Sequence, residues 1–301
     1  MKSKKVPVII FVYNRPQHTR ETVEALLKND LADQSDLTVF SDAAKNSGAA
    51  QQVQEVRDYL KTITGFKSVR IVEREENWGL AKSIIQGVTE VVNQYGKVIV
   101  LEDDIVTSPS FLTFMNEALG FFQENKNVWH IGGWNYPIDT SGLNDTFLWR
   151  VMNCWGWATW SDRWAHFEKD TDQLLSEFSS QDVYRFNLDS AHDFWSQVKM
   201  NKSGRINTWA IYWYAAIFRK GGLCLGPTES LVQNVGFDGS GMHCGDSNTM
   251  QVSISMKSMH EMPSVMAEDV EAVNRIRQFL LKSRPGFARR LAGKIKRLVR
   301  L

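Results

Sequence analysis

Four short apolar runs alternate with segments of helical periodicity, and this alternation constrains the fold more than any other feature of the chain. The runs cover residues 6–13, 37–41, 68–72 and 97–101. Apolar residues at helical spacing predict helices over 19–29, 50–62 and 80–95. Strands that alternate with such helices are typical of βαβ units. We therefore expect an α/β fold with a mostly parallel sheet.

Three carboxylates, Glu102, Asp103 and Asp104, directly follow the fourth apolar run. Grouped carboxylates repel one another and need a cation or a basic neighbour. Hard oxygen ligands on a short acidic turn suit Mg²⁺ or Mn²⁺, and such ions keep open positions for the phosphates of a nucleotide. The turn therefore predicts a metal site that grips a diphosphate. In the structural alternative, the acids cap a helix that begins near Ser108 and Pro109.

Polar and ionisable side chains also follow the other three runs. In open sheets of this kind, ligands bind beyond the carboxyl ends of the strands. The first run is followed by neither a Gly-x-Gly-x-x-Gly motif nor a Walker-type lysine loop, which argues against the common dinucleotide and P-loop sites. A nucleotide would instead be held by the ring of Tyr13, by Asp42 on a base or ribose, and by the metal on the phosphates.

Ten of the eleven tryptophans lie between Trp129 and Trp213. An indole has a flat face that suits packing on a sugar ring, but the density of the cluster at 154–160 favours core packing for most members. Farther on, residues 236–243 hold several glycines, which indicates close backbone approach to a ligand or a mobile lid. His243 in this loop is a candidate metal or phosphate contact, although a lone histidine is more often structural.

Composition and cysteine usage indicate an ordinary globular chain. It has 301 residues, of which 43% are apolar, enough for one large α/β domain or two smaller ones. No apolar stretch approaches the roughly 20 residues of a membrane span. Its three widely spaced cysteines disfavour a disulfide framework and fit a reducing cytosol.

The last twenty residues form a separate basic segment. Residues 282–301 carry eight basic side chains and no acid, so the rest of the chain has a net charge of −7 within a total of +1. An acidic body with a basic tail argues against a nucleic-acid partner. The spacing of apolar residues over 285–301 predicts an amphipathic helix that lies on an anionic membrane surface. A solvated, partly disordered end is the alternative.

The order of these motifs resembles the GT-A fold of nucleotide-sugar glycosyltransferases. Within that fold the chain is most similar to bacterial sugar transferases of surface-polysaccharide (lipopolysaccharide or capsule) synthesis, distant relatives of the eukaryotic N-acetylglucosaminyltransferase that begins complex N-glycans. The resemblance covers residues 6–245. It rests on the segments PVIIFVYNRP (7–16), NWGLAK (77–82), LEDD (101–104), WGWATW (155–160) and SLVQNVGFDGSGMH (230–243).

The resemblance implies that the acidic triplet takes the place of the family's D-x-D motif. Asp104 would then bind Mn²⁺ or Mg²⁺, with Glu102 as a further ligand, and Asp103 would face the ribose or the donor sugar. His243 would be the late-chain histidine that such enzymes bring to the metal or the phosphates.

The resemblance also implies a pocket for the nucleotide sugar. The pocket would be formed by Tyr13, Arg15 and Asp42. The segment that contains Asn77, Gly79 and Lys82 would close over the diphosphate, where a helix start and a cation both favour negative charge. The list of expected donor contacts is therefore Tyr13, Arg15, Asp42, Asn77, Gly79, Lys82 and Asp103.

The catalytic base is not assigned by the resemblance. Relatives often carry an acidic residue in the segment that matches 208–213, where this chain has no carboxylate. Asp193, Asp238 and Glu229 are candidates on chemistry alone. Asp193 ranks first because it precedes a tryptophan-rich segment.

The expected reaction moves a sugar from a nucleotide diphosphate donor, a UDP-sugar, to a hydroxyl of a lipid-linked or growing glycan, with inversion. The metal would offset charge on the leaving diphosphate while a carboxylate takes the acceptor proton. Residues 1–125 would bind the nucleotide sugar, 126–281 would form the acceptor side of the same domain, and 282–301 would be the basic tail. The enzyme would be cytoplasmic and peripherally associated with the inner face of the cell membrane.

Two other classes stay open. A sugar nucleotidyltransferase also uses an α/β sheet, metal carboxylates and a nucleotide, but a lysine- and glycine-rich phosphate loop does not follow the first run here. A non-catalytic carbohydrate-binding protein would use the tryptophans as a sugar platform, and the clustered carboxylates argue against it.

Overall fold

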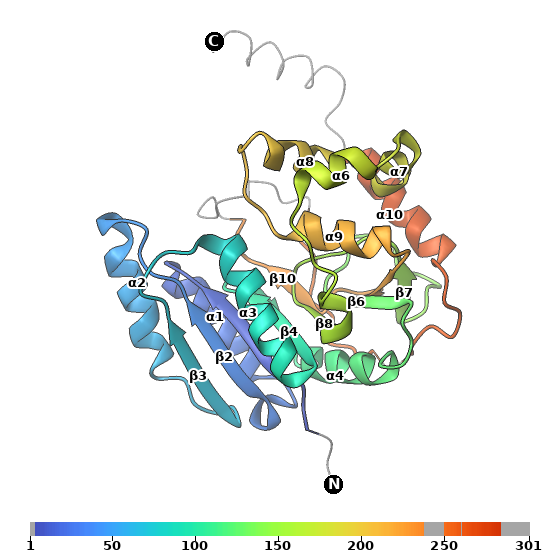
Figure 1. Cartoon of the computed structure of the whole chain (residues 1–301). Coiled ribbons are helices and arrows are strands. Elements are labelled where there is room, and N and C mark those ends of the chain that lie inside the picture. The colour runs from blue at the N-terminus through green and yellow to red at the C-terminus, as the bar shows by residue number, and fades with distance from the viewer. Residues whose placement is uncertain (1–3, 238–249, 260, 284–301) are drawn as a thin grey trace.

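The structure is a computed structural model that describes residues 4–237, 250–259 and 261–283 (Figure 1). One half of its main sheet consists of four parallel strands, and β1 pairs with both β2 and β4 while β2 pairs with β3. The strands predicted from the sequence are therefore confirmed, with small shifts at their ends. They are β1 (Val8–Val12), β2 (Asp36–Ser41), β3 (Ser68–Glu73) and β4 (Lys97–Glu102).

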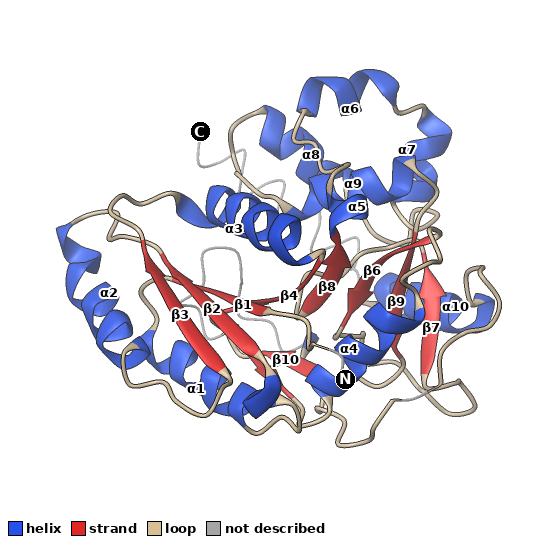
Figure 2. Ribbon diagram, turned by 60° about the horizontal axis from the view of Figure 1, so that its bottom comes forward, coloured by secondary structure: helices blue, strands red, loops and turns tan. Residues whose placement is uncertain are grey.

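The helices between these strands are α1 (Pro16–Leu27), α2 (Ser47–Leu60) and α3 (Gly79–Tyr95). Each begins slightly earlier than its apolar pattern predicts, because proline starts α1 and the side chain of Asn46 caps α2. The strand order β3-β2-β1-β4 and right-handed crossovers require α1 and α2 on one face of the sheet and α3 on the other. Figure 2 shows α1 and α3 on opposite faces.

Four further strands extend the sheet beyond β4, to give the order β3-β2-β1-β4-β8-β6-β9-β7. β8 is antiparallel to β4 and β6, β9 is parallel to β6, and β7 is antiparallel to β9. β6 and β9 therefore run in the same direction as β4. The α/β fold class is confirmed, and one continuous sheet spans the expected boundary at residue 125. The added strands are β6 (Val128–Gly132), β7 (Thr146–Trp149), β8 (Trp157–Trp160) and β9 (Leu223–Pro227).

A second, two-stranded sheet begins directly after the acidic turn. Strand β5 (Ile105–Thr107) pairs antiparallel with β10 (Val232–Asn234). Helix α4 (Phe111–Phe121) starts only after β5, with Ser110 at its N-cap and no acid in its first turn. The alternative in which the three acids cap this helix is therefore wrong.

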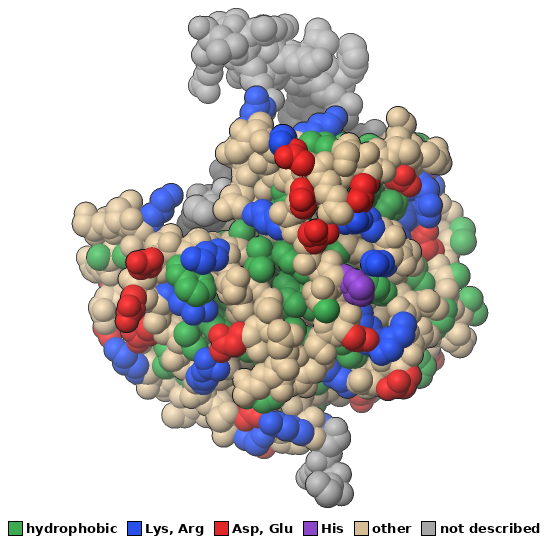
Figure 3. Space-filling view, viewed as in Figure 1, with side chains coloured by type: hydrophobic (Ala, Val, Ile, Leu, Met, Phe, Trp, Pro, Cys, Tyr) green, Lys and Arg blue, Asp and Glu red, His purple; other side chains and the backbone are tan. Residues whose placement is uncertain are grey.

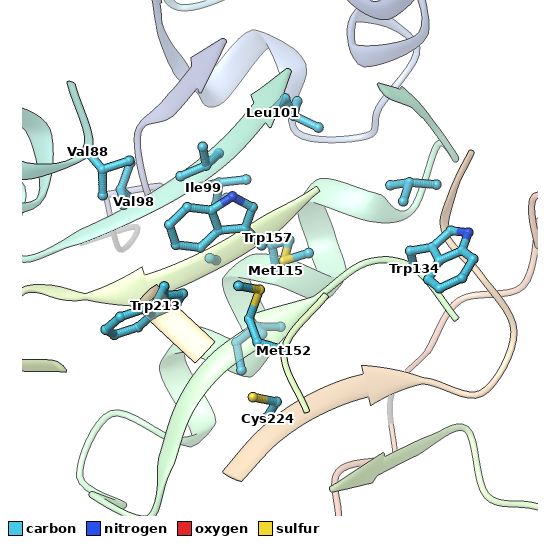
Figure 4. Close-up of a cluster of buried hydrophobic side chains, with 14 of the residues drawn as sticks. Val88, Val98, Ile99, Leu101, Met115, Trp134, Met152, Trp157, Trp213 and Cys224 are labelled. Atoms are coloured by element: carbon cyan, nitrogen blue, oxygen red, sulfur yellow. The ribbon is translucent and has the colours of Figure 1, made fainter. Parts of the chain in front are cut away.

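Tryptophan side chains form much of the core beside the second half of the sheet. Nine of the ten between positions 129 and 213 are buried, while Trp155 is partly exposed. Trp157 stacks on Trp209 with ring centroids 5.1 Å apart and on His130 at 5.3 Å. Figure 4 shows Trp157 beside Ile99 of β4. Core packing is thus confirmed as the main role of these rings, which removes the basis for a broad indole platform that binds sugar.

The other helices lie beside the second half of the sheet, except for the short helix η1, which contacts α1 in the first half. None of the helices in the described ranges has the length and apolar character that crossing a membrane requires. On the face shown in Figure 3, acidic and basic side chains are intermixed. The predicted membrane-binding segment 285–301 lies outside the described residues. The helices are η1 (Ala32–Gln34), α5 (Ser161–Trp164), α6 (Thr171–Glu177), α7 (Ser180–Phe186), α8 (Trp195–Lys202), α9 (Ala210–Arg219) and α10 (Val270–Lys282).

Candidate active site

The acidic turn lies at the point where the order of the parallel strands reverses. β1 and β4 are neighbours in the sheet. β2 and β3 lie on the far side of β1, whereas β8 lies on the far side of β4, so the sheet extends in opposite directions from this pair. Ligands of open α/β sheets bind at such switch points, beyond the carboxyl ends of the strands. Arg15 follows β1, and Asp103 and Asp104 follow β4, so both loops open onto this point.

Arg15 is the cationic partner of the acidic turn. Its Nη1 lies 2.8 Å from Oδ2 of Asp104 and 3.7 Å from Oδ1 of Asp103. The three side chains are between 11% and 13% exposed, so water screens their interaction only partly. The structure thus places Arg15, predicted for the nucleotide pocket, on the carboxylates predicted to hold the metal.

One guanidinium does not offset the charge of three carboxylates. Burial, and then the charges of Asp104 and Asp103, raise the pKa of Glu102 well above its usual value. Burial and the charge of Asp104 raise the pKa of Asp103 to about 7, although Arg15 acts in the opposite direction. Shifts in this direction mean that burial and mutual repulsion disfavour the ionised cluster, and that more positive charge than Arg15 provides is needed to offset them. A bound divalent cation would supply that charge.

The oxygen donors of the turn fit Mg²⁺ or Mn²⁺ held jointly with a diphosphate. Within the described ranges, no three Asp, Glu, His or Cys side chains converge as a complete ligand set. Mg²⁺ needs only one or two protein carboxylates at such sites, because water and substrate phosphates fill its other positions. Asp104 and Glu102 are the carboxylates predicted to hold it, and Asp103, predicted to face the ribose or the donor sugar, lies between them and is a further candidate ligand. His243 lies outside the described residues.

The segment after β10 packs directly on Asp104. The Val235 N–H donates to the Asp104 carbonyl at 2.9 Å, and Asn234 Nδ2 donates to Asp104 Oδ1 at 3.4 Å. The carbonyl of Gly236 accepts from Arg15 Nη2 at 3.4 Å, and a Cβ at this glycine would lie 2.2 Å from Asp104 Oδ2. The backbone at Gly236 thus closely approaches the side chains of Asp104 and Arg15, and its predicted approach to a ligand stays a prediction. Asn234 was missed, because nothing in the sequence pairs it with a turn 130 residues away.

Asp42 holds the beginning of α3. Its Oδ1 accepts from the N–H groups of Ala43 and Trp78, at 3.0 and 2.9 Å. Its Oδ2 accepts from the N–H of Gly79 at 2.8 Å and from Nδ2 of Asn77 at 3.2 Å. These four donors occupy the four lone-pair positions of the carboxylate. The predicted bond from Asp42 to a base or ribose would therefore have to displace one of them.

Two cations flank Trp78 at the N-terminus of α3. The Arg74 guanidinium lies 3.9 Å from the ring centroid and the Lys82 ammonium lies 4.3 Å from it. Gly79 opens the helix with a φ of +70°, a conformation that favours glycine. The structure brings together the predicted residues Asn77, Gly79 and Lys82, and it adds Arg74 and Trp78. The helix dipole and the two cations make this end of α3 attractive to phosphates.

One partly exposed aromatic side chain lies on each half of the site, Tyr13 on the first half and Trp155 on the second. The Tyr13 hydroxyl accepts the Lys45 N–H at 3.0 Å and thereby links the loops after β1 and β2. On the other half, the Trp155 ring contacts Trp134 edge-on at 4.6 Å and Phe237 at 5.4 Å. Because Phe237 directly follows Gly236, Trp155 is the tryptophan of the 154–160 cluster that borders the acidic turn.

Of the three candidate bases, Glu229 accepts a hydrogen bond from the Ser255 hydroxyl at 2.6 Å, and Asp193 and Asp238 differ in their connection to this site. Asp193 is exposed, and its Oδ1 accepts the Ser196 N–H at 3.1 Å near the start of α8. Its described contacts do not reach the acidic turn. Asp238 lies outside the described residues, but it is the second residue after Gly236 in the sequence.

The parallel half-sheet, with an acidic turn at its switch point, defines an α/β protein of the GT-A class. The family model of glycosyl transferase family 2 matches residues 8–165, just over half of the chain. The chain therefore belongs to glycosyl transferase family 2. The matched segment contains Arg15, Asp42, the start of α3 and the acidic turn.

Two solved structures are similar to the chain. One is S. aureus TarS, with 20% identity and a TM-score of 0.31 over 42% of this chain and 21% of TarS, so the chain spans about a fifth of that protein. The other is the mannosyltransferase PcManGT from Pyrobaculum calidifontis in complex with GDP-Man and Mn²⁺, with 14% identity and a TM-score of 0.38 over 71% of this chain and 70% of that one. No curated protein sequence matches the chain.

Proposed function

We propose that the protein is a metal-dependent glycosyltransferase that moves a sugar from a UDP-sugar to a hydroxyl of a lipid-linked or growing glycan. The observation that supports this most is that the acidic turn, Arg15 and the cationic start of α3 all follow the carboxyl ends of the parallel strands of a family 2 domain. A nucleotide diphosphate with its metal complements such a combination of carboxylates and cations. The role in bacterial surface-polysaccharide synthesis rests on the sequence resemblance.

The chemistry requires the diphosphate to leave while the sugar gains oxocarbenium character. Asp103 and Asp104 would hold the divalent cation, which offsets the charge that builds on the leaving diphosphate. Lys82 and Arg74, the two cations beside Trp78, would bind the phosphate oxygens. Asp42 keeps the start of α3 in place through the Trp78 and Gly79 amides. These residues orient the donor and stabilise the leaving group.

The acceptor hydroxyl needs a base. We propose Asp238 ahead of Asp193, because Asp238 follows within two residues the glycine that contacts Arg15 and crowds Asp104. Asp193, by contrast, is engaged with Ser196 near the start of a helix. A base opposite the leaving group would give inversion at the anomeric carbon.

The basic segment 285–301 would hold the enzyme on an anionic membrane surface at the inner face of the cell membrane, where a lipid-linked acceptor is presented. Each basic residue near such a surface contributes about 1 kcal/mol. Deletion of 285–301 should abolish cosedimentation with vesicles that contain anionic lipid while activity on a soluble acceptor is retained. Undiminished cosedimentation would remove this part of the proposal.

A screen of nucleotide sugars against the purified protein, with and without Mn²⁺, tests the donor. A ligand at a hundred times its dissociation constant adds roughly 2.7 kcal/mol to the free energy of unfolding, which a thermal melt detects. A Mn²⁺-dependent rise with one UDP-sugar, followed by UDP release on addition of acceptor, supports the proposal. Pyrophosphate release from a nucleoside triphosphate would instead support the nucleotidyltransferase alternative.

A pair of aspartate variants tests the acidic turn. Asp104→Asn keeps the side-chain size but removes the charge that would bind the metal, so transfer should fall by about 10³-fold. Asp33→Asn is the matched control, because Asp33 is exposed and lies in η1, away from the switch point. Full turnover by a folded Asp104→Asn protein would refute the assignment of this residue.

A further inference from the structure

A cavity, here called the distal cavity, has a volume of about 590 Å³. Leu223, the first residue of β9, lines it, whereas the acidic turn follows the last residue of β4. Because β9 and β4 run in the same direction, Leu223 lies at the amino-terminal edge of the sheet and the acidic turn at the carboxyl edge. Figure 1 likewise shows α7 and α9, which contribute residues to the cavity, away from β2 and β3. The distal cavity is therefore separate from the candidate active site.

The charges that line the distal cavity balance. Glu177 accepts from Arg219 Nη2 at 2.8 Å, and Glu268 pairs with Arg150. With three cations and three anions the cavity has no net formal charge, so it does not concentrate phosphates or polyanions. The six residues are Arg150, Arg185, Arg219, Glu177, Asp182 and Glu268.

These paired groups present hydrogen-bond donors and acceptors side by side. A guanidinium offers several N–H donors in a fixed plane, and a carboxylate offers several lone pairs. A sugar hydroxyl donates one hydrogen bond and accepts others, so a row of hydroxyls can satisfy both kinds of group at once. A neutral polyol matches this wall better than a phosphate or a purely apolar ligand.

Two phenylalanine rings give the same cavity an apolar surface. Phe178 and Phe218 are partly exposed and stack with centroids 5.6 Å apart and planes at 27°. The Arg185 guanidinium lies 5.7 Å from the Phe218 centroid. Flat aromatic surface beside charged hydrogen-bonding groups fits a pyranose ring, which has an apolar face and a polar edge. The volume is within the usual range for small-ligand cavities.

An uncommon backbone conformation fixes one wall of the cavity. Leu188, Asp189 and Ser190 have φ values of 50°, 51° and 62°, in the left-handed region that side chains disfavour. This turn places Oδ2 of Asp189 2.8 Å from Nη2 of Arg150. Arg150 is thereby held between two carboxylates, since Glu268 binds its Nη1. Runs of such conformations occur preferentially at functional positions, where surrounding contacts maintain them.

We propose that the distal cavity is a second carbohydrate-binding site, which takes a neutral oligosaccharide through its arginine–carboxylate pairs and its two phenylalanine rings. The binding itself does not depend on the reaction at the acidic turn. Its use rests on the proposed function: the cavity would hold a part of the growing glycan that is remote from the reacting end.

The test measures binding of the full chain to immobilised oligosaccharides, in EDTA and in the Asp104→Asn background, so that the candidate active site does not contribute. The probes are neutral oligosaccharides of glucose, galactose and mannose, with sialylated and sulfated oligosaccharides as the anionic set. We expect retention of a neutral probe. Arg185→Ala should weaken it by about tenfold, which corresponds to about 1.4 kcal/mol.

Arg185→Ala suits this purpose because Arg185 is exposed, so its loss leaves the core intact. Phe218→Leu is a second variant that removes the ring but keeps an apolar side chain, and it should weaken the same probe. Arg205→Ala is the matched control, since Arg205 is an exposed arginine that does not line the cavity. Loss of binding in the first two variants with full binding in the third supports the site.

Three results would overturn the proposal: retention of no neutral probe, retention of anionic probes alone, or equal binding by Arg185→Ala and Arg205→Ala. Failure of the proposed transfer reaction would not produce any of them, because every measurement is made without metal and without turnover. A positive result with an inactive enzyme would therefore separate the distal cavity from the function of the acidic turn.

Discussion

Nη1 of Arg15 lies 2.8 Å from Oδ2 of Asp104, so the carboxylate predicted to bind the metal already has a cationic partner within the protein. The two residues are 89 positions apart and follow adjacent parallel strands. A metal ion at this carboxylate must therefore displace Arg15 or compete with its charge.

Arg15→Ala should increase the affinity of the protein for Mn²⁺ by about tenfold, because it removes both a competitor and a like charge at the acidic turn. Isothermal titration with Mn²⁺ in the absence of nucleotide measures the effect. Arg20→Ala is the control and should leave the affinity unchanged, because Arg20 lies on the exposed surface of α1, the helix that Arg15 precedes. Weaker Mn²⁺ binding by Arg15→Ala would mean that Arg15 supports the metal site.

Gly236→Ala should abolish most transfer activity, because its Cβ would lie 2.2 Å from Asp104 Oδ2 and would push the carboxylate or the loop out of place. We expect a loss of about 10²-fold in kcat/KM from a displacement on this scale. Gly120→Ala is the control, since Gly120 is exposed in α4 with open space around it. That substitution should raise helix stability by up to about 1 kcal/mol. Normal activity in Gly236→Ala would show that the loop adapts.

Asp42→Ala should loosen the start of α3, because it leaves the N–H groups of Trp78 and Gly79 without their acceptor. Loss of such a cap costs about 1 kcal/mol. Hydrogen exchange of the two amides should rise, and the KM for the donor should increase. Asp269→Ala removes the cap of α10 and should cost a similar stability without any change in donor KM. Equal donor KM in the two variants would separate Asp42 from the donor site.

His130 makes the protein less stable in acid. Burial lowers the pKa of His130 to about 3, and its ring is held by the Trp213 indole N–H and the Asn153 carbonyl. The unfolded chain binds this proton near pH 6.5, so the stability that the neutral ring contributes is lost as the pH falls from about 6.5 toward 3. The slope is at most about 1.4 kcal/mol per pH unit.

Urea unfolding of the wild type and of His130→Gln at a series of pH values measures this slope. The variant should be less stable near pH 7, because it loses the fit of the buried ring, but its stability should fall less steeply below about pH 6.5. Parallel curves for the two proteins would assign the acid sensitivity to other groups.

The first half of the fold is predictable from the sequence because its central strands, β1 and β4, are buried on both faces along most of their length. Such strands appear as continuous apolar runs, as 97–101 does, and each helix between them has its own apolar stripe. The second half is harder to predict. The residues of β8 look like a dense tryptophan cluster, and only their antiparallel pairing with β4 and β6 shows that they are a strand.

The candidate site shows the same division. The acids at 102–104 and the glycine-rich loop are visible as local patterns. Their contacts are not, since Asn234 and Asp104 meet through a pairing of strands that are remote in the sequence. The pairing of Asp42 with the start of α3 is hidden for the same reason. In the sequence, Asp42 is an isolated acid after a strand, which is typical of a residue that contacts a ligand. In the structure it accepts from the backbone N–H groups of Trp78 and Gly79, and no sequence pattern identifies such partners.

Strand β5 has β10 as its partner in the described structure, and β10 ends at Asn234. The backbone that holds Asp104 is therefore in place only after the chain has been synthesised past Gly236. A nascent chain that has emerged only to residue 230 already contains the acids, Arg15 and α3, but it lacks the strand that fixes the acidic turn. The surroundings of the acidic turn are thus completed only when the last quarter of the chain is translated.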